Sequence, residues 1–156
     1  MKCSEQRLEG LAGTAPESIE NWILLEYSAA WPKKIQLKDL ELSDALREKL
    51  QAKHKESGWK FLLIRRPTEK GNRLFWSQSG QIYQTEAEGD WSWESMEYWR
   101  KYSEPFFLIC THGNRDRCCG TLGGAIFASM RRQEPNWVWQ CSHLGGHRFA
   151  PTALSL

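Results

Sequence analysis

Cysteine and histidine are concentrated in the last third of this chain. Four of its five cysteines and three of its four histidines lie between Cys110 and His147. One cluster has the sequence C-T-H-G-N-R-D-R-C-C-G over residues 110–120, and the other has W-Q-C-S-H-L-G-G-H over residues 139–147. Thiolate and imidazole are ligands for iron, zinc and copper. One secondary-structure element separates the two loops, so a fold can bring their cysteines and histidines to one point. The sequence therefore predicts a metal or metal-cluster centre.

The segments before these clusters alternate between strand and helix signals. Apolar runs at residues 22–27 and 59–64 are suited to buried strands, and Ser79-Gly80 joins two short segments that resemble a hairpin. Residues 40–53 predict an amphipathic helix, because leucines recur at every fourth position and Ser43 or Asp44 can cap its start. The leucines are Leu42, Leu46 and Leu50.

The C-terminal part repeats this alternation. A strand at residues 105–110 leads into the first cluster, and a strand at residues 137–141 leads into the second. Residues 120–132 between them predict a helix, with one apolar face made by Leu122, Ile126 and Met130. Strands that alternate with helices predict the α/β fold class, a sheet with flanking helices.

The 156 residues are predicted to form a leading loop and two α/β units. The loop covers residues 1–16, the N-terminal unit residues 17–85 and the C-terminal unit residues 105–156. Residues 86–104 are expected to be an acidic linker followed by an aromatic stretch, W-S-W-E-S-M-E-Y-W. A helix laid across the sheet is the main interpretation of this stretch, and an aromatic surface that stacks on a ligand is the alternative.

Composition and charge exclude several function classes. The formal net charge is +2, and the pairs Arg65-Arg66 and Arg131-Arg132 are too short for a nucleic-acid footprint. The first seven residues are polar and lack the apolar core of a signal peptide, and no apolar run approaches the length of a membrane span. We therefore expect a cytoplasmic protein with no nucleic-acid or membrane partner. In that compartment an odd number of cysteines favours metal or redox use.

Two cysteines and two histidines form the predicted ligand set. They are Cys110 and Cys119, nine positions apart, and His143 and His147, four positions apart. Both cysteines belong to the loop between the strand and the helix. Gly145 and Gly146 separate the histidines, which favours a tight loop over a helix and lets backbone approach a bulky inorganic core.

This set is compatible with three chemistries. Zinc would take it tetrahedrally, although zinc-binding cysteines usually lie two to four residues apart. A [2Fe–2S] cluster spans more space and tolerates the longer loop. Without a metal, Cys118 or Cys119 would be a reactive thiol beside Arg115 and Arg117. A different set would use the two C-x-H pairs, Cys110 with His112 and Cys141 with His143, but its spacing departs from the Rieske pattern.

The same two boxes carry a resemblance to a known family. The C-x8-C loop of residues 110–120 and W-Q-C-S-H-L-G-G-H-R-F-A-P of residues 139–151 are similar to the sucrase/ferredoxin-like family. L-A-G-T-A-P at residues 11–16 and W-I-L-L-E-Y-S-A-A-W-P-K at residues 22–33 resemble its opening segment. The resemblance implies a thioredoxin-like ferredoxin-type sheet, whose second half would be incomplete here because few residues follow the histidine box. It also implies that Cys110, Cys119, His143 and His147 hold a bis-histidinyl [2Fe–2S] cluster.

An electron carrier is the function that follows from this resemblance. Histidine ligation implies one-electron transfer coupled to protonation, with an unidentified redox protein as partner. Arg115, Arg117 and Arg148 would flank the site, with Gly145 and Gly146 close to the cluster. Sucrase activity is not expected, because no carboxylate pair for glycoside hydrolysis is evident. The alternatives are a structural zinc module that binds a partner, and a thioredoxin-like thiol redox protein, although no C-x-x-C motif is present.

Overall fold

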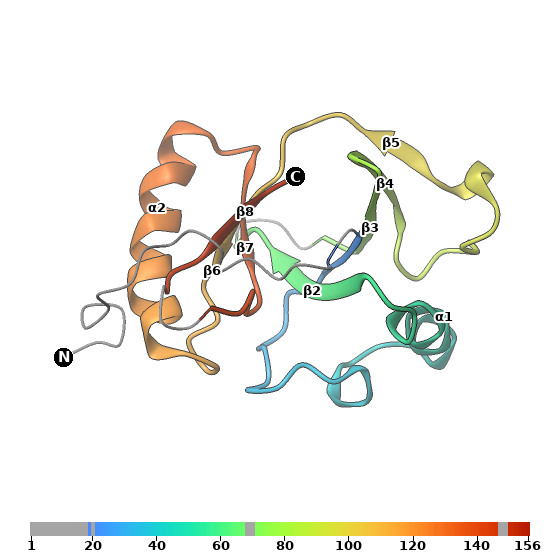
Figure 1. Cartoon of the computed structure of the whole chain (residues 1–156), viewed down its shortest axis with the longest axis horizontal. Helices are drawn as coiled ribbons and strands as arrows, with labels where there is room; N and C mark the ends of the chain where they lie inside the picture. Colours follow the sequence, from blue (N-terminus) through green and yellow to red (C-terminus); the bar gives the residue numbers. More distant parts are fainter. Residues whose placement is uncertain (1–18, 20, 68–70, 147–149) are drawn as a thin grey trace.

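The computed structural model describes residues 19, 21–67, 71–146 and 150–156. Its described strands form one 8-stranded sheet in the order β5-β4-β3-β1-β2-β7-β6-β8 (Figure 1). The strands are β1 (Asn21–Glu26), β2 (Trp59–Arg65), β3 (Arg73–Gln78), β4 (Gln81–Glu86), β5 (Arg100–Tyr102), β6 (Phe107–Cys110), β7 (Val138–Cys141) and β8 (Ala153–Ser155). The α/β class predicted from sequence is confirmed. The predicted N-terminal loop at residues 1–16 lies outside the described residues.

Two parallel strand pairs organise this sheet. β1 pairs in parallel with β2, and β6 pairs in parallel with β7, whereas every other described pairing is antiparallel. β2 joins the two halves through its antiparallel contact with β7, in the register Ile64 to Cys141. β8 extends the edge by pairing with β6, an arrangement that the sequence pattern did not reveal.

Each parallel pair is connected by a helix. The helix α1 (Asp44–His54) links β1 to β2, and α2 (Gly124–Gln133) links β6 to β7 (Figure 1). The side chain of Ser43 caps α1 by accepting a hydrogen bond from the Leu46 N–H, as predicted. Neither helix in the described part of the chain has the length and apolar character needed to cross a membrane.

The buried face of α2 differs from the prediction at one residue. Phe127 is its buried residue and packs with Ile109 of β6 and Val138 of β7. The predicted Leu122 and Met130 are half-buried and pack against core residues. Ile126, which the fourfold spacing placed in the core, is 43% exposed. The reason is that the first turns of this segment form a π-helix, η4 (Cys119–Gly123), whose wider winding rotates the following residues out of a regular 3.6-residue phase.

The predicted hairpin at Ser79-Gly80 is confirmed between β3 and β4. Ser79 has φ 51° and Gly80 has φ 73°, the left-handed conformations that a tight two-residue hairpin turn requires. Gly58 has φ 79° after α1, which turns the chain into β2.

The aromatic stretch at residues 91–99 is not the helix that was expected. Only the short 3-10 turn η3 (Met96–Tyr98) is helical, and the chain then enters β5. The rings of Trp93 and Trp99 stack on Trp76 of β3, with centroids 5.5 and 5.3 Å away. Trp91 is buried as well, at 3% exposure. These rings are core, so the alternative of an exposed ligand-stacking surface is also wrong.

Candidate functional site

The two cysteine and histidine loops leave the sheet at neighbouring strand ends. Cys110 is the last residue of β6 and Cys141 the last of β7, and the two are in register in the parallel pair. In a sheet with parallel strands, ligands bind in the crevice outside the carboxyl ends of the strands. The loop at residues 111–116 and the loop at residues 142–146 therefore start side by side.

Cys119 is positioned by the helix start that follows the first loop. The carboxylate Oδ1 of Asp116 accepts hydrogen bonds from the N–H groups of Cys118 at 2.8 Å and Cys119 at 3.3 Å, which is an N-cap arrangement. Gly123 then brings this helix against β6. A Cβ atom placed on Gly123 would lie 2.0 Å from the carbonyl oxygen of Cys110, so only glycine permits this approach.

Three of the four predicted ligands come together. Donor atoms of Cys110, Cys119 and His143 all lie within 4.8 Å of one another. Nδ1 of His143 is 3.7 Å from Sγ of Cys110 and 3.7 Å from Sγ of Cys119. Both cysteines are buried, whereas His143 is half-buried and forms the exposed side of the group. A group of two thiols and one imidazole at such spacing can hold a metal ion.

The two thiols of this group are coupled. The Cys119 thiol donates a hydrogen bond to Cys110, and this is the main cause that lowers the pKa of Cys110 to about 6, against the opposing effect of burial. The N–H groups of His112 and Leu144, and the ring of His143, also stabilise the Cys110 thiolate. The pKa of Cys119 is raised, first because it keeps the proton that it donates and then by burial. Cys110 is therefore the thiolate of the group, and its negative charge favours binding of a cation.

The second loop has the tight form predicted from its glycines. Gly145 has φ 103° and Gly146 has φ 63°, so the segment after His143 is not helical. His147 and Arg148 lie outside the described residues. The fourth predicted ligand therefore stays a prediction, while the first three are placed as one group.

His112 does not belong to the ligand group. Its Nε2 donates to the carbonyl oxygen of Pro32 at 3.0 Å, and its Nδ1 accepts the N–H of His143 at 3.3 Å. Both ring nitrogens are occupied, so the alternative set built from C-x-H pairs loses one of its histidines. Cys141 is fully buried, and burial raises its pKa well above the usual value. Cys118 is buried and is not part of the donor group found among the described residues.

The N-terminal unit supplies part of the site's support. Besides the Pro32 contact, the Asn114 side-chain amide donates to the carbonyl oxygen of Trp31 at 2.9 Å, so the segment after β1 holds the first loop at two points. Lys60 of β2 donates from Nζ to the carbonyl oxygen of Leu144 in the second loop. Sequence patterns gave no indication of these supporting contacts of His112, Asn114 and Lys60, because the contacts join segments about 80 residues apart.

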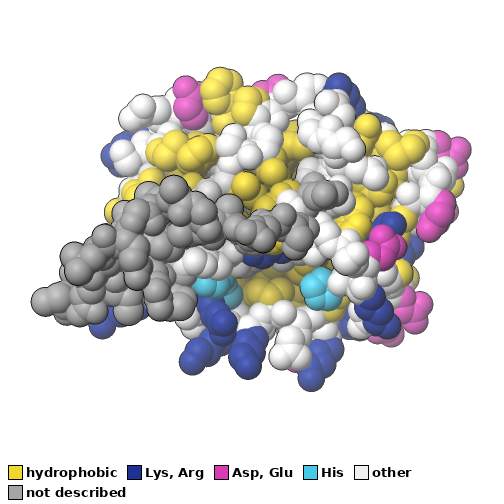
Figure 2. All heavy atoms as spheres, viewed as in Figure 1, with side chains coloured by type: hydrophobic (Ala, Val, Ile, Leu, Met, Phe, Trp, Pro, Cys, Tyr) yellow, Lys and Arg dark blue, Asp and Glu magenta, His cyan; other side chains and the backbone are white. Residues whose placement is uncertain are grey.

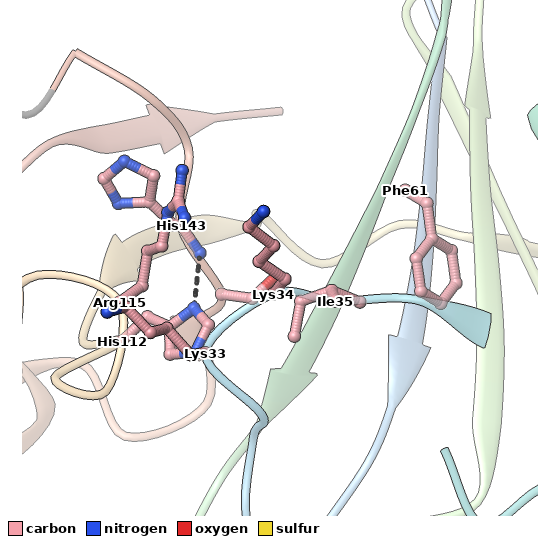
Figure 3. A pocket seen from close by; sticks show the side chains of 8 residues that line it. Lys33, Lys34, Ile35, Phe61, His112, Arg115 and His143 are labelled. Carbon is pink, nitrogen blue, oxygen red and sulfur yellow. Dashed lines mark hydrogen bonds between the residues drawn. The ribbon is translucent and has the colours of Figure 1, made fainter. Parts of the chain in front are cut away.

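A pocket of about 240 Å³ opens beside the exposed side of His143. Its lining comes from both halves of the chain, namely Lys33, Lys34, Ile35, Phe61, His112, Arg115, Ser142 and His143. Figure 3 shows Arg115 next to His112 and His143 at one end and Phe61 at the other. Of the predicted flanking arginines, Arg115 lines this pocket and Arg117 does not.

Fold and site together define an α/β protein with a Cys₂His group at the carboxyl ends of a parallel strand pair. The family comparison is consistent with this class: the family model described as sucrase/ferredoxin-like matches residues 11–156. The chain belongs to the sucrase/ferredoxin-like family. Comparisons with curated proteins and with solved structures give no significant match.

Proposed function

We propose that this protein carries a [2Fe–2S] cluster held by Cys110, Cys119, His143 and His147, and that it transfers single electrons. The observation that supports the proposal most is the convergence of Cys110, Cys119 and His143 in a member of the sucrase/ferredoxin-like family. The buried thiol pair provides a thiolate, and Gly145 and Gly146 have no side chains that would block an inorganic core. A bound cluster would supply the one-electron chemistry.

The protein's own contribution centres on His143. Its Nδ1 faces the two sulfurs, which leaves Nε2 on the opposite side of the ring to take up or release a proton. Two neutral imidazoles in place of two thiolates also make the site less negative, which favours the reduced state. Centres with two histidine ligands have potentials of roughly −150 to +300 mV, against about −400 mV for plant-type ferredoxins. We expect a pH-dependent potential above the plant-type value.

A structural zinc site is the second candidate, and the donor spacing favours it. With Zn–S of about 2.3 Å and Zn–N of about 2.0 Å, the sulfur–nitrogen edge of a tetrahedral site is about 3.5 Å. The observed Sγ–Nδ1 distances are 3.7 Å. A cluster divides its ligands between two irons, so at least one donor would have to lie further from the others than it does here. Zinc accepts the three donors as they stand.

One experiment separates these functions. The protein is purified without oxygen, and its visible spectrum is recorded together with iron, sulfide and zinc contents. Iron and sulfide with visible absorption support the cluster. Zinc without colour would establish the structural site, and a colourless protein without metal would leave the Cys110–Cys119 thiol pair as the functional group.

Matched variants assign the ligands. Cys119→Ser and His143→Ala should lose the metal, whatever it is. Cys118→Ser and His54→Ala are the controls, because Cys118 is the buried neighbour outside the donor group and His54 is exposed at the end of α1. Equal metal loss in Cys118→Ser and Cys119→Ser would mean that the donor group is wrongly assigned. In the cluster form, His143→Cys should keep the absorption, lower the potential and weaken its pH dependence.

A further inference from the structure

The pocket beside His143 carries an excess of positive charge. Lys33, Lys34 and Arg115 line it, and no acidic residue is among its described lining residues. All three side chains are exposed, and none forms an ion pair or side-chain hydrogen bond with a residue in the described part of the chain. The nearby carboxylate of Asp116 is engaged with the Cys118 and Cys119 N–H groups.

The same pocket has an apolar side, and one member of the donor group, His143, lines it. Phe61 lies at the end away from Arg115, and Ile35 lies between Phe61 and Lys34 (Figure 3), which gives a small hydrophobic surface beside basic side chains. His143 is part of the wall, and it is the exposed member of a group whose two cysteines are buried. Figure 2 shows Lys and Arg side chains gathered near histidines along the lower edge of this face.

We propose that this pocket is the docking surface for an acidic face of a redox partner protein, seated against His143. The inference rests on the proposed function, because an electron carrier has to meet its partner at the exposed side of its redox centre. An apolar centre with a charged rim is the usual anatomy of a protein interface. Three cations with no ion pair among the described residues lie near His143, the half-buried member of the donor group, and they select an acidic partner and attract it at long range.

The first test measures binding and needs no cluster. The ¹⁵N-labelled protein is titrated with a short peptide of glutamates around one phenylalanine, and in parallel with inorganic phosphate. We expect the peptide to shift the amide signals of Lys33, Lys34 and Arg115, and the Lys33→Glu/Lys34→Glu variant to lose most of this response. Phosphate that bound these residues as tightly as the peptide would overturn the proposal in favour of a small-anion site. Absence of peptide binding would also overturn it.

The charge-matched control is Lys38→Glu/Lys55→Glu. Both lysines are exposed, neither lines the pocket, and the change in net charge is the same. This control should bind the peptide nearly as well as the unmodified protein. An equal loss of binding in both double variants would show that only the net charge matters, which contradicts a docking surface at this pocket.

The second test measures electron exchange in the cluster-loaded protein. The reduced protein is mixed with ferricyanide, a trianion that takes one electron from it to become ferrocyanide, and separately with the hexaammineruthenium(III) trication. Reversing the two charges should slow the ferricyanide reaction about tenfold at low salt and speed the ruthenium reaction, because steering changes encounter rates by roughly 10- to 1,000-fold. At about 1 M salt the difference should disappear.

Failure of this inference and failure of the proposed function are distinguishable. Iron and sulfide contents and the visible spectrum decide whether a cluster is present. With a cluster present and rates unchanged in Lys33→Glu/Lys34→Glu, the docking surface is wrong and the electron carrier stands. With no cluster present, the electron carrier is wrong, and the peptide titration still decides whether the pocket binds an acidic surface.

Discussion

The backbone N–H of His143 donates a hydrogen bond to Nδ1 of the His112 side chain, 3.3 Å away (Figure 3). The other ring nitrogen of His112 donates to the carbonyl oxygen of Pro32. These two bonds require a neutral imidazole with its proton on Nε2. His112 is 3% exposed and packs edge-on against Trp31, so one buried ring joins the segment after β1 to both ligand loops.

Acid should destabilise the metal-free protein through His112. Burial is the main cause that lowers the pKa of His112 in the folded state. Its stabilising contribution is therefore complete above the unfolded-state pKa of about 6.5 and is lost as the pH falls through the lower folded-state pKa. We expect the free energy of unfolding, measured with urea in the presence of a chelator, to fall between pH 7.5 and pH 5.

The variant His112→Gln isolates the contribution of His112 to the pH dependence of stability. Cys110 changes stability in the same direction, because its pKa is also lowered, to about 6. His112→Gln removes the titrating ring and keeps Cys110, so its stability should depend less steeply on pH than that of the unmodified protein. Identical slopes for the two proteins would show that the His112 ring does not stay neutral in the fold.

Gly123→Ala should damage the site, whereas Gly124→Ala should not. A Cβ on Gly123 meets the Cys110 carbonyl oxygen at 2.0 Å, while one on Gly124 has no heavy atom within 4 Å. The first substitution has to push the helix that carries Cys119 away from β6, at a cost of about 2 kcal/mol or more. The second adds helix propensity worth about 0.5–1 kcal/mol. Urea unfolding and Co²⁺ titration check both, and equal stability of the two variants would contradict the close approach.

Local chemistry explains what the sequence could predict. The hairpin at Ser79-Gly80, the cap at Ser43 and the loop form of Gly145-Gly146 depend on a few adjacent residues, and all three appear in the structure. Buried strands were recognisable for the same reason, because a short apolar run such as Leu62–Ile64 is typical of a strand with both faces in the core. The donor group of Cys110, Cys119 and His143 was expected from residue type and spacing in the two loops.

Contacts between distant segments explain what the sequence could not predict. The aromatic residues of 91–99 were expected to form a helix, but their tryptophan rings stack on Trp76 of another strand, and the chain there is mostly not helical. The π-helix before α2 lies where Gly123 comes close to the Cys110 backbone, and it changes which residue of α2 is buried. His112 looked like a possible ligand until its bond to Pro32 was known.

The N-cap of the Cys119 helix should matter for stability and for metal binding. Asp116→Ala removes the acceptor for the N–H groups of Cys118 and Cys119, and loss of such a cap costs about 1 kcal/mol. Asp116→Asn keeps an oxygen acceptor and should retain most of the stability. We expect Co²⁺ affinity to follow the order unmodified protein, Asn variant, Ala variant. An Ala variant that bound Co²⁺ as well as the Asn variant would show that Cys119 is held by other contacts.

Lys60 should control the second ligand loop from across the sheet. Its Nζ donates to the Leu144 carbonyl oxygen, next to His143, and lies 5.6 Å from the centre of the Trp22 ring. Burial lowers the pKa of Lys60, while Cys141 and Cys110 act in the opposite direction, so the ammonium group is close enough to favour negative charge on those sulfurs. Removing a group that orients metal ligands typically weakens metal binding about 10- to 100-fold, and we expect Lys60→Met to weaken Co²⁺ binding about tenfold.

Two further substitutions decide whether Lys60 acts through its charge and hydrogen bond. Lys60→Arg keeps both and should restore most of the Co²⁺ affinity. Lys53→Met is the control, because Lys53 also lies over a tryptophan ring, that of Trp59, but its ion pair with Glu56 is on the surface of α1. It should leave Co²⁺ binding unchanged. If Lys60→Met bound Co²⁺ as tightly as Lys53→Met, the loop would be held by its own glycine turn and the neighbouring His112 contact, without help from β2.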